Sequence, residues 1–172
     1  MKLNSLQVRL LNRLARGEGG TGGFTLIELI VVILIIGVLA SISLPSFLNQ
    51  VNRAKAAEAA SYVGTINRAQ QAYRLENNDF AESLAELAIG IPQQTSNFEY
   101  SVQVGSSVAN AIAEPLDSSV PGMLGVAYVA QVENGQATTV AFVCRSDTPG
   151  ETPPPYAAPP PSNQCPGGST KL

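Results

Sequence analysis

Residues 22–45 read GGFTLIELIVVILIIGVLASISLP, an apolar run that contains one carboxylate, Glu28. No polar side chain occurs from Leu29 to Ala40, and Glu28 is the only charged residue from Phe24 to Leu48. About 20 such residues in a helix span the hydrocarbon core of a bilayer. A carboxylate within such a helix costs about 2.5 to 3.5 kcal/mol on insertion scales and usually has a partner. We therefore expect a membrane-spanning helix in which Glu28 has a specific role.

The charged residues are sorted along the chain. They make up 13% of its 172 residues, below the roughly 25% usual in soluble domains. Residues 1–23 carry four Lys or Arg and one acidic residue. Residues 24–172 carry six Lys or Arg and twelve Asp or Glu. By the positive-inside rule, this distribution predicts a cytoplasmic N-terminus and an exported body. The acidic body argues against stable nucleic-acid binding, which needs clustered Lys and Arg.

A secretory signal peptide is an alternative interpretation of the apolar run. Ala40 and Ser41 would then form the small-residue cleavage site. This interpretation fits poorly, because the helical pattern continues beyond Pro45 and because glycines directly precede the run.

Residues 46–77 predict a continuation of the same helix. They contain no proline, their only glycine is Gly64, and their alanines favour helix. We therefore expect one helix from about Thr25 to Asn77, roughly 80 Å long. Its first half is apolar on all sides, and Gly37 and Pro45 are the expected sites of bending or local melting. Its second half is expected to pack on its own domain through a stripe at helical spacing: Tyr62, Ile66, Ala69 and Tyr73.

A short second helix is expected after residue 77. Asp79 and Glu82 have the spacing of a capping box at its start. Leu84 and Leu87 would provide its apolar face, and Gly90 would end it.

A small antiparallel sheet is expected to follow. Residues 98–104 alternate between apolar and polar side chains, which predicts a half-buried strand. The runs 126–133 and 137–144 flank Asn134-Gly135, which is a strong hairpin signal. Residues 105–122 lack a clear pattern, and we expect a loop there.

The C-terminal region is rich in proline and glycine from residue 147 onward, so no regular element is expected. Cys144 and Cys165 both lie on the predicted exported side, where an even pair predicts a disulfide worth about 3 kcal/mol. Buried free thiols are the alternative. The bridge would hold residues 146–164 against the sheet edge and shield unpaired strand groups.

Catalytic and ligand-binding signals are sparse. The chain contains no histidine, which excludes His-based triads and zinc sites of the usual kind. Residues 17–22 match G-x-G-x-x-G, but no strand precedes them and an apolar helix follows. No spacing of carboxylates matches a calcium loop. We expect no enzyme activity, no cofactor and no metal site.

The run Gly23-Phe24-Thr25-Leu26-Ile27-Glu28, followed by the apolar span, closely resembles the cleavage and methylation motif of type IV prepilins. The resemblance is specific through about residue 60 and looser beyond. It implies an α+β, pilin-like fold in which the apolar half of a long helix protrudes, and the other half packs on a small antiparallel sheet with a disulfide-closed C-terminal loop. The residues INRAQQAY at 66–73 look most like cyanobacterial major pilins.

The resemblance also implies a processing pathway. A membrane aspartyl protease, the prepilin peptidase, would cut after Gly23 and methylate the new amine of Phe24. Glu28 would then be the fifth residue of the mature chain, with an assembly role that it shares with Thr25, and Pro45 matches the helix-kink proline of pilins. The implied leader of 23 residues is longer than the commonest pilin leaders. Four regions follow: the leader 1–23, the apolar helix half 24–48, the globular head 49–145, and the Pro/Gly-rich region 146–172.

Two roles of Glu28 compete on physical grounds. Cleavage would create a positive amine at Phe24, and this amine could meet Glu28 of a copy already packed in a staggered bundle. Two desolvated charges that neutralise each other only at one stagger would set the register of assembly. Alternatively, Glu28 extends to the cytoplasmic headgroups. The adjacent Gly-Phe junction favours the assembly role.

The expected function is that of a structural subunit of a type IV pilus, a fibre for motility, adhesion or DNA uptake. The expected partners are other copies of the chain, the prepilin peptidase and methyltransferase, the pilus assembly machinery and, before assembly, the inner membrane. The subunit would first be a single-pass inner-membrane protein and then part of the extracellular fibre. The alternatives are a type II secretion pseudopilin and a signal-anchored surface protein that does not polymerise.

Overall fold

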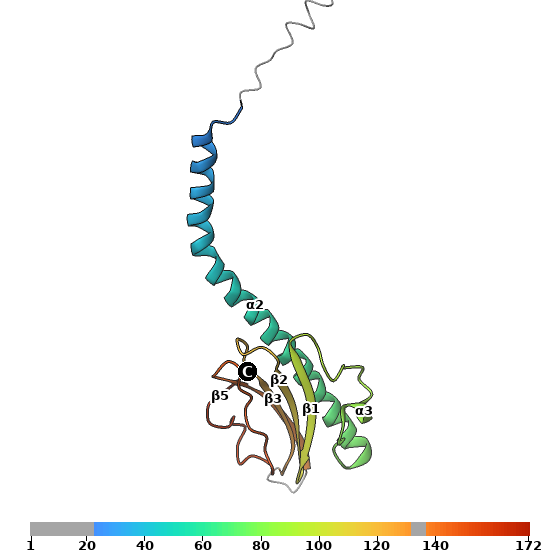
Figure 1. Ribbon diagram of the computed structural model, residues 1–172. Coiled ribbons are helices and arrows are strands. Elements are labelled where there is room, and N and C mark those ends of the chain that lie inside the picture. Colours follow the sequence, from blue (N-terminus) through green and yellow to red (C-terminus); the bar gives the residue numbers. More distant parts are fainter. Residues whose placement is uncertain (1–22, 132–136) are drawn as a thin grey trace, which may run out of the picture. The chain divides into compact units, whose positions relative to one another are not determined.

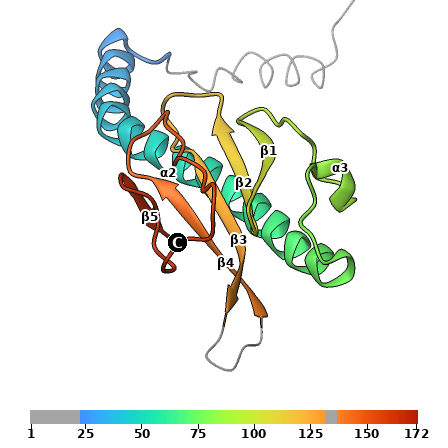
Figure 2. The ribbon, with the colours of Figure 1, turned by 90° about the horizontal axis from the view of Figure 1, so that it is seen from below.

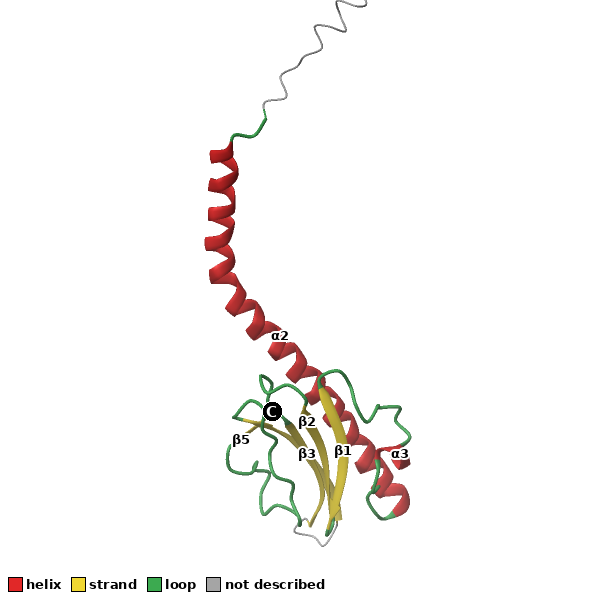
Figure 3. Cartoon of the chain, in the orientation of Figure 1, coloured by secondary structure: helices red, strands yellow, loops and turns green. Residues whose placement is uncertain are grey.

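The computed structural model describes residues 23–131 and 137–172. The chain divides into two compact units, residues 1–46 and residues 47–172, and helix α2 contributes residues to both (Figure 1). Figure 3 distinguishes the helices from the strands. The elements are α2 (Leu26–Asn77), α3 (Leu84–Leu87), β1 (Phe98–Gly105), β2 (Val108–Pro115), β3 (Met123–Gln131), β4 (Ala137–Ser146) and β5 (Ser169–Lys171).

Helix α2 has nearly the bounds that the sequence predicts. It ends where Asn78 adopts a left-handed conformation, with φ of 57°, and donates its N–H to the Arg74 carbonyl at 3.0 Å. The helix is unbroken at Gly37 and Pro45, although Pro45 has no N–H to donate to the carbonyl four residues earlier. Bending or melting at these two residues therefore stays a prediction.

The five strands form one antiparallel sheet in the order β1-β2-β3-β4-β5 (Figure 2). Strand β1 confirms the strand expected at residues 98–104. Strands β3 and β4 confirm the hairpin, with Met123 opposite Arg145 and Gln131 opposite Ala137. Its Asn134-Gly135 turn lies outside the described residues.

The loop expected at residues 105–122 is wrong, because strand β2 (Val108–Pro115) lies within it. Six successive residues of β2, from Val108 to Ala113, are buried. Strand β2 lies between β1 and β3 with both faces covered: Ala111 packs with the core beneath α2, and Ile112 packs on the other side. A strand that is buried on both faces lacks the apolar–polar alternation that a sequence search relies on.

The C-terminal region also contains a short element that the sequence does not predict. Strand β5 pairs with β4, with Thr170 opposite Arg145. Residues 147–168 contain no helix or strand, as expected from their prolines and glycines.

Helix α3 is present, but its cap differs from the expected one. Ser83 is the N-cap residue; its hydroxyl accepts a hydrogen bond from the Glu86 N–H at 3.4 Å and donates one to the Glu86 carboxylate at 3.2 Å. The capping box is therefore Ser83 with Glu86 and not Asp79 with Glu82. Ala88, with φ of 50°, ends the helix before Gly90. The two pairs have the same spacing in sequence. The observed pair, Ser83 with Glu86, starts directly before the apolar residues Leu84 and Leu87 of the helix.

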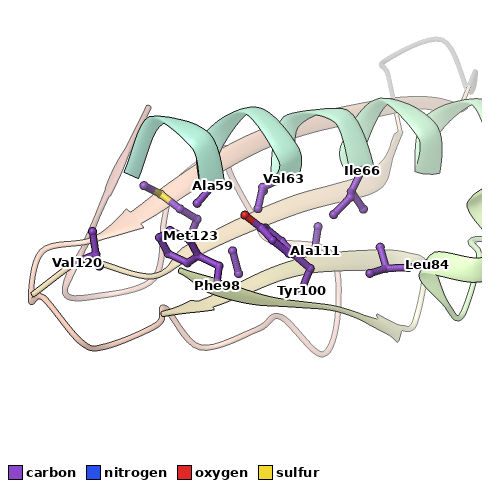
Figure 4. Close-up of a cluster of buried hydrophobic side chains, with 10 residues drawn as sticks. Ala59, Val63, Ile66, Leu84, Phe98, Tyr100, Ala111, Val120 and Met123 are labelled. Carbon is purple, nitrogen blue, oxygen red and sulfur yellow. The ribbon is translucent and has the colours of Figure 1, made fainter. Parts of the chain in front are cut away.

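The second half of α2 packs on the sheet through a core of aliphatic and aromatic side chains. Ala59, Val63 and Ile66 point from the helix toward Phe98 and Tyr100 of β1 (Figure 4). Of the expected stripe Tyr62, Ile66, Ala69 and Tyr73, the structure buries only Ile66 fully, while the other three are half-buried. The buried stripe is Ala59, Val63, Ile66 and Gln70, with Asn67 beside it.

Two polar side chains on this buried face explain why the stripe was misplaced. The Gln70 side chain donates to the Ala81 carbonyl and accepts from the Ala81 N–H, both at 2.9 Å. The Asn67 side chain donates to the Phe142 carbonyl at 3.0 Å. Burial of an amide costs free energy unless it is hydrogen-bonded. Both amide atoms of Gln70 are bonded, whereas Asn67 is bonded through its nitrogen and its buried Oδ1 has no partner among the described residues. Hydrophobic periodicity cannot find such positions.

An ion pair fastens the β2–β3 connection to α2. Lys55 Nζ lies 2.9 Å from a carboxylate oxygen of Asp117. The Ser119 N–H and the Lys55 ammonium both donate to this carboxylate, and they lower the pKa of Asp117 to about 2. Lys55 therefore has its partner within its own chain.

Close approach of α2 to the sheet requires a glycine in β3. A Cβ atom at Gly125 would lie 2.5 Å from Val63 Cγ1 and 2.6 Å from Asn67 Oδ1. We expect Gly125→Ala to lower the free energy of unfolding by about 1 to 3 kcal/mol, because the helix must shift. Chemical denaturation of the full chain in detergent measures this change.

The matched control is Gly64→Ala on α2, where the new Cβ would meet only Arg68 Nη1 at 3.8 Å. This substitution should stabilise the helix by about 0.5 to 1 kcal/mol. A Gly125→Ala variant as stable as the unsubstituted chain would contradict the close packing.

Candidate functional site

The start of α2 is organised by Thr25 and Glu28. The N–H and the hydroxyl of Thr25 both donate to Glu28 Oε2 at 2.8 Å, and the Glu28 N–H donates to Thr25 Oγ1 at 3.3 Å. These reciprocal bonds form a capping box, which satisfies N–H groups that have no partner inside the helix. The Thr-x-x-Glu spacing is visible in the sequence. The roles expected from the sequence were assembly for both residues and, alternatively, extension of Glu28 to the headgroups, and neither of these is a helix cap.

Only one of the two carboxylate oxygens of Glu28 accepts hydrogen bonds in the cap. Both Thr25 bonds end on Oε2, and within the described residues Oε1 makes no hydrogen bond. The side chain is exposed. A carboxylate in the first turn is also favoured by the helix dipole. Glu28 thus orders the helix start and keeps one oxygen available to accept a further hydrogen bond.

The junction upstream of the cap is accessible. Gly23 and Phe24 lie outside the helix, and Phe24 is 83% exposed. A Cβ atom at Gly23 would meet none of the described residues within 4 Å. The backbone between these residues is therefore open to an enzyme.

The first half of α2 exposes an apolar surface on all sides. Every large apolar side chain from Phe24 to Leu48 is between 43% and 83% exposed. Two serine hydroxyls in this stretch are satisfied locally, since Ser41 and Ser43 donate to the carbonyls of Val38 and Ala40. Length and composition allow this helix to cross a membrane. A surface of this size needs a bilayer or other protein to cover it.

The disulfide between Cys144 and Cys165 is present, with a Cα–Cα distance of 5.7 Å. Cys144 is fully buried on β4 and packs in a cluster with Phe142 and, less deeply, Val140. These three alternate residues share one face of the strand, as a period of two requires.

The C-terminal segment covers the face of the sheet opposite α2, which corrects the expected position at the edge. Asn110 of β2 and Tyr156 exchange two hydrogen bonds at 2.8 and 2.9 Å, and Tyr128 of β3 donates to Asn163 at 2.6 Å. The Tyr156 ring also packs on Phe142. Strand β5 occupies the edge of β4 instead. The segment is thus docked by side chains, as well as by the disulfide.

The remaining chemistry of the described residues is limited. No group of three or more His, Cys, Asp or Glu side chains in that part of the chain could hold a metal ion. The glycine-rich match at residues 17–22 lies outside the described residues.

Loss of the disulfide should loosen the C-terminal segment. We expect Cys165→Ser to lower the free energy of unfolding by about 2 to 4 kcal/mol, because the loop closed across 21 residues is released. Chymotrypsin should then cleave near Tyr156 faster, while membrane insertion of the apolar helix is unchanged. Denaturation and proteolysis under non-reducing conditions measure both effects. The unsubstituted chain with its disulfide reduced is the control. If the Cys165→Ser variant is as stable as the oxidised unsubstituted chain, the side-chain contacts alone hold the segment.

Comparison with known families agrees with this geometry. A family model described as "Type IV pilin-like G and H" matches residues 56–166, which is more than half of the chain. A second model, "Prokaryotic N-terminal methylation motif", matches residues 20–44, the stretch that contains the capping box. No curated protein matches the chain. The chain belongs to the type IV pilin-like family and carries the N-terminal methylation motif of prokaryotic pilins and pseudopilins.

Proposed function

We propose that the chain is the precursor of a structural subunit of a type IV pilus. Removal of residues 1–23 would leave an apolar helix half, 24–48, which packs with the same helix of other copies in the fibre core. The observation that supports this most directly is the continuous apolar surface of that helix, which is exposed on every side. Before assembly the same surface would lie in the inner membrane, with the N-terminus cytoplasmic and the head exported.

We propose cleavage between Gly23 and Phe24 by a prepilin peptidase, followed by methylation of the Phe24 amine. The exposed, non-helical backbone at this junction and the capped helix directly after it support the assignment. The division into leader, helix half, head and C-terminal region follows from this cut.

The processing site can be tested directly. Mass spectrometry of subunits from sheared fibres should show an N-methylated Phe24 terminus. Gly23→Val should leave uncut precursor in the membrane, because a branched side chain obstructs the scissile backbone. Normal maturation of that variant, or a terminus near Ser41, would show that the site is elsewhere.

The free oxygen of Glu28 suggests how the mature terminus is recognised. In the proposed fibre, the Phe24 amine of an incoming copy binds Glu28 Oε1 of a copy already packed, while Thr25 holds Oε2 and fixes the orientation of the carboxylate. A charged pair within an apolar core is stable only when both partners meet, so it sets the stagger between copies.

Two substitutions separate registration from capping. Glu28→Gln keeps a side chain that suits a capping box but removes the charge, and it should reduce fibre yield strongly. Thr25→Val removes the hydroxyl of the cap but keeps the carboxylate, and it should reduce yield much less. Both yields are measured in sheared cell-surface fractions, relative to the subunit in the membrane. Fibres from Glu28→Gln at the unsubstituted yield would leave Glu28 with a capping role only.

We infer a pilin in preference to the related pseudopilins of type II secretion. The support is the disulfide-closed C-terminal segment, which packs on β2, β3 and β4 at the face of the sheet opposite α2, together with the likeness of residues 66–73 to cyanobacterial major pilins. A fibre of this class serves motility, adhesion or DNA uptake. Long surface fibres containing this chain, produced at its normal expression level, distinguish a pilin from a pseudopilin. In such a fibre, Gly37 and Pro45 would be the places where the packed helix bends.

A further inference from the structure

The charges of residues 47–172 are segregated in sequence. No Lys or Arg occurs from residue 75 to residue 144, a segment with eight acidic residues. This segment includes α3 and strands β1 to β3. The basic residues of this unit lie instead on α2, β4 and β5: Arg53, Lys55, Arg68, Arg74, Arg145 and Lys171.

Because of the order of the strands, charges that are separated in the sequence lie on opposite sides of the sheet. Strand β1 is at one edge of the sheet, and β4 and β5 are at the other. Figure 2 shows α3 beside β1 and far from β5. Glu82, Glu86 and Glu99 of α3 and β1 therefore lie on one side of the sheet. Arg145 and Lys171 of β4 and β5 lie on the opposite side, where Asp147 is also found.

The basic side contains a hollow between α2 and β4. It has a volume of about 310 Å³ and is lined by Arg53, Ala56, Met123 and Arg145, among others. A neighbouring hollow of about 340 Å³ shares Arg53, Ala56 and Arg145. No acidic side chain of residues 23–131 and 137–172 lines either one. Among the described residues, Lys55 and Arg74 have carboxylate partners within 4.0 Å, whereas Arg53 and Arg145 have none.

The acidic side contains a matching hollow between α3 and β1. Its volume is about 270 Å³, and its charged lining in the described chain consists of Glu82 and Glu99. Both side chains are exposed, and neither carboxylate forms a hydrogen bond within the described part of the chain. Glu86 differs, because its carboxylate caps α3.

We propose that the Arg53–Arg145 side of one copy binds the Glu82–Glu99 side of a second copy in the fibre. The proposal rests on the proposed function and adds a contact between heads to the packing of the helices. Because the two surfaces differ and lie on opposite sides, each copy keeps one of them unoccupied after pairing. Such a contact does not close on itself in a dimer, and repeated at an angle it generates a helical polymer. Complementary charges of this kind mainly fix orientation and partner choice.

Charge reversal tests the contact in cells that produce the full chain. Arg53→Glu with Arg145→Glu should lower the yield of sheared fibres at least about tenfold, since acidic surfaces would then face each other. Glu82→Arg with Glu99→Arg should have the same effect. The chain with all four substitutions should recover to within about threefold of the unsubstituted yield, because the attraction is restored with its sign exchanged. Glu151→Lys, an exposed site in the C-terminal segment, is the control and should not change the yield.

Formation of the Cys144–Cys165 disulfide in each variant reports that its head has folded. Absence of fibres from the unsubstituted chain would contradict the proposed function itself. Fibres of normal yield from either reversed pair, or failure of the fourfold variant with its disulfide intact, would overturn only the head contact.

Cross-linking within assembled fibres gives an independent measurement. Arg53→Cys combined with Glu99→Cys should yield a ladder of multimers with a short bismaleimide, while each single substitution should yield none. A ladder absent from fibres of the double variant would also overturn the contact.

Discussion

Helix α2 has to bury apolar side chains in two different surroundings, and this constraint organises the whole molecule. From Leu26 to Leu48 it is apolar on every side, so only a bilayer or other apolar helices can cover it. From Ala59 to Gln70 a single face is buried, and a sheet covers that face. The change along α2 from an apolar surface on all sides to a single apolar face determines where the globular head begins. Val63 and Asn67 of this face fill the space that a Cβ atom at Gly125 would need, so β3 requires a glycine there.

The sheet needs cover on both faces, and the C-terminal segment supplies the second. Residues 147–168 have too many prolines and glycines to form regular structure. They dock because Asn110 and Tyr156 bond to each other and because the Cys144–Cys165 disulfide fixes the far end. Residues Val108 to Ala113 of strand β2 can therefore be buried on both faces of the sheet.

Sequence patterns predicted the features with strong local signals and missed those that depend on distant partners. The long helix, strand β1, the β3–β4 hairpin and the disulfide each have a signal within a short stretch. Strand β2 was missed because burial on both faces removes the alternation of apolar and polar residues. Strand β5 was missed because it has only three residues, and its one partner in the sheet is β4. The buried Gln70 and Asn67 depend on backbone groups 11 and 75 residues away. Of the candidate site, the residues Thr25 and Glu28 were identified, but the bonds that join them were not.

Apolar packing alone would not define a fibre. Helices that are apolar on every side attract one another in many rotations and shifts, because the hydrophobic effect has no direction. A regular polymer needs interactions that are favourable at one arrangement only. The chain carries two candidates in its separate units: the carboxylate of Glu28, held by Thr25 with one oxygen free, and the oppositely charged sides of the head. The first would fix the axial shift between helices, and the second the rotation between neighbouring heads. In this scheme the apolar surface supplies most of the attraction, and a few charges determine the geometry.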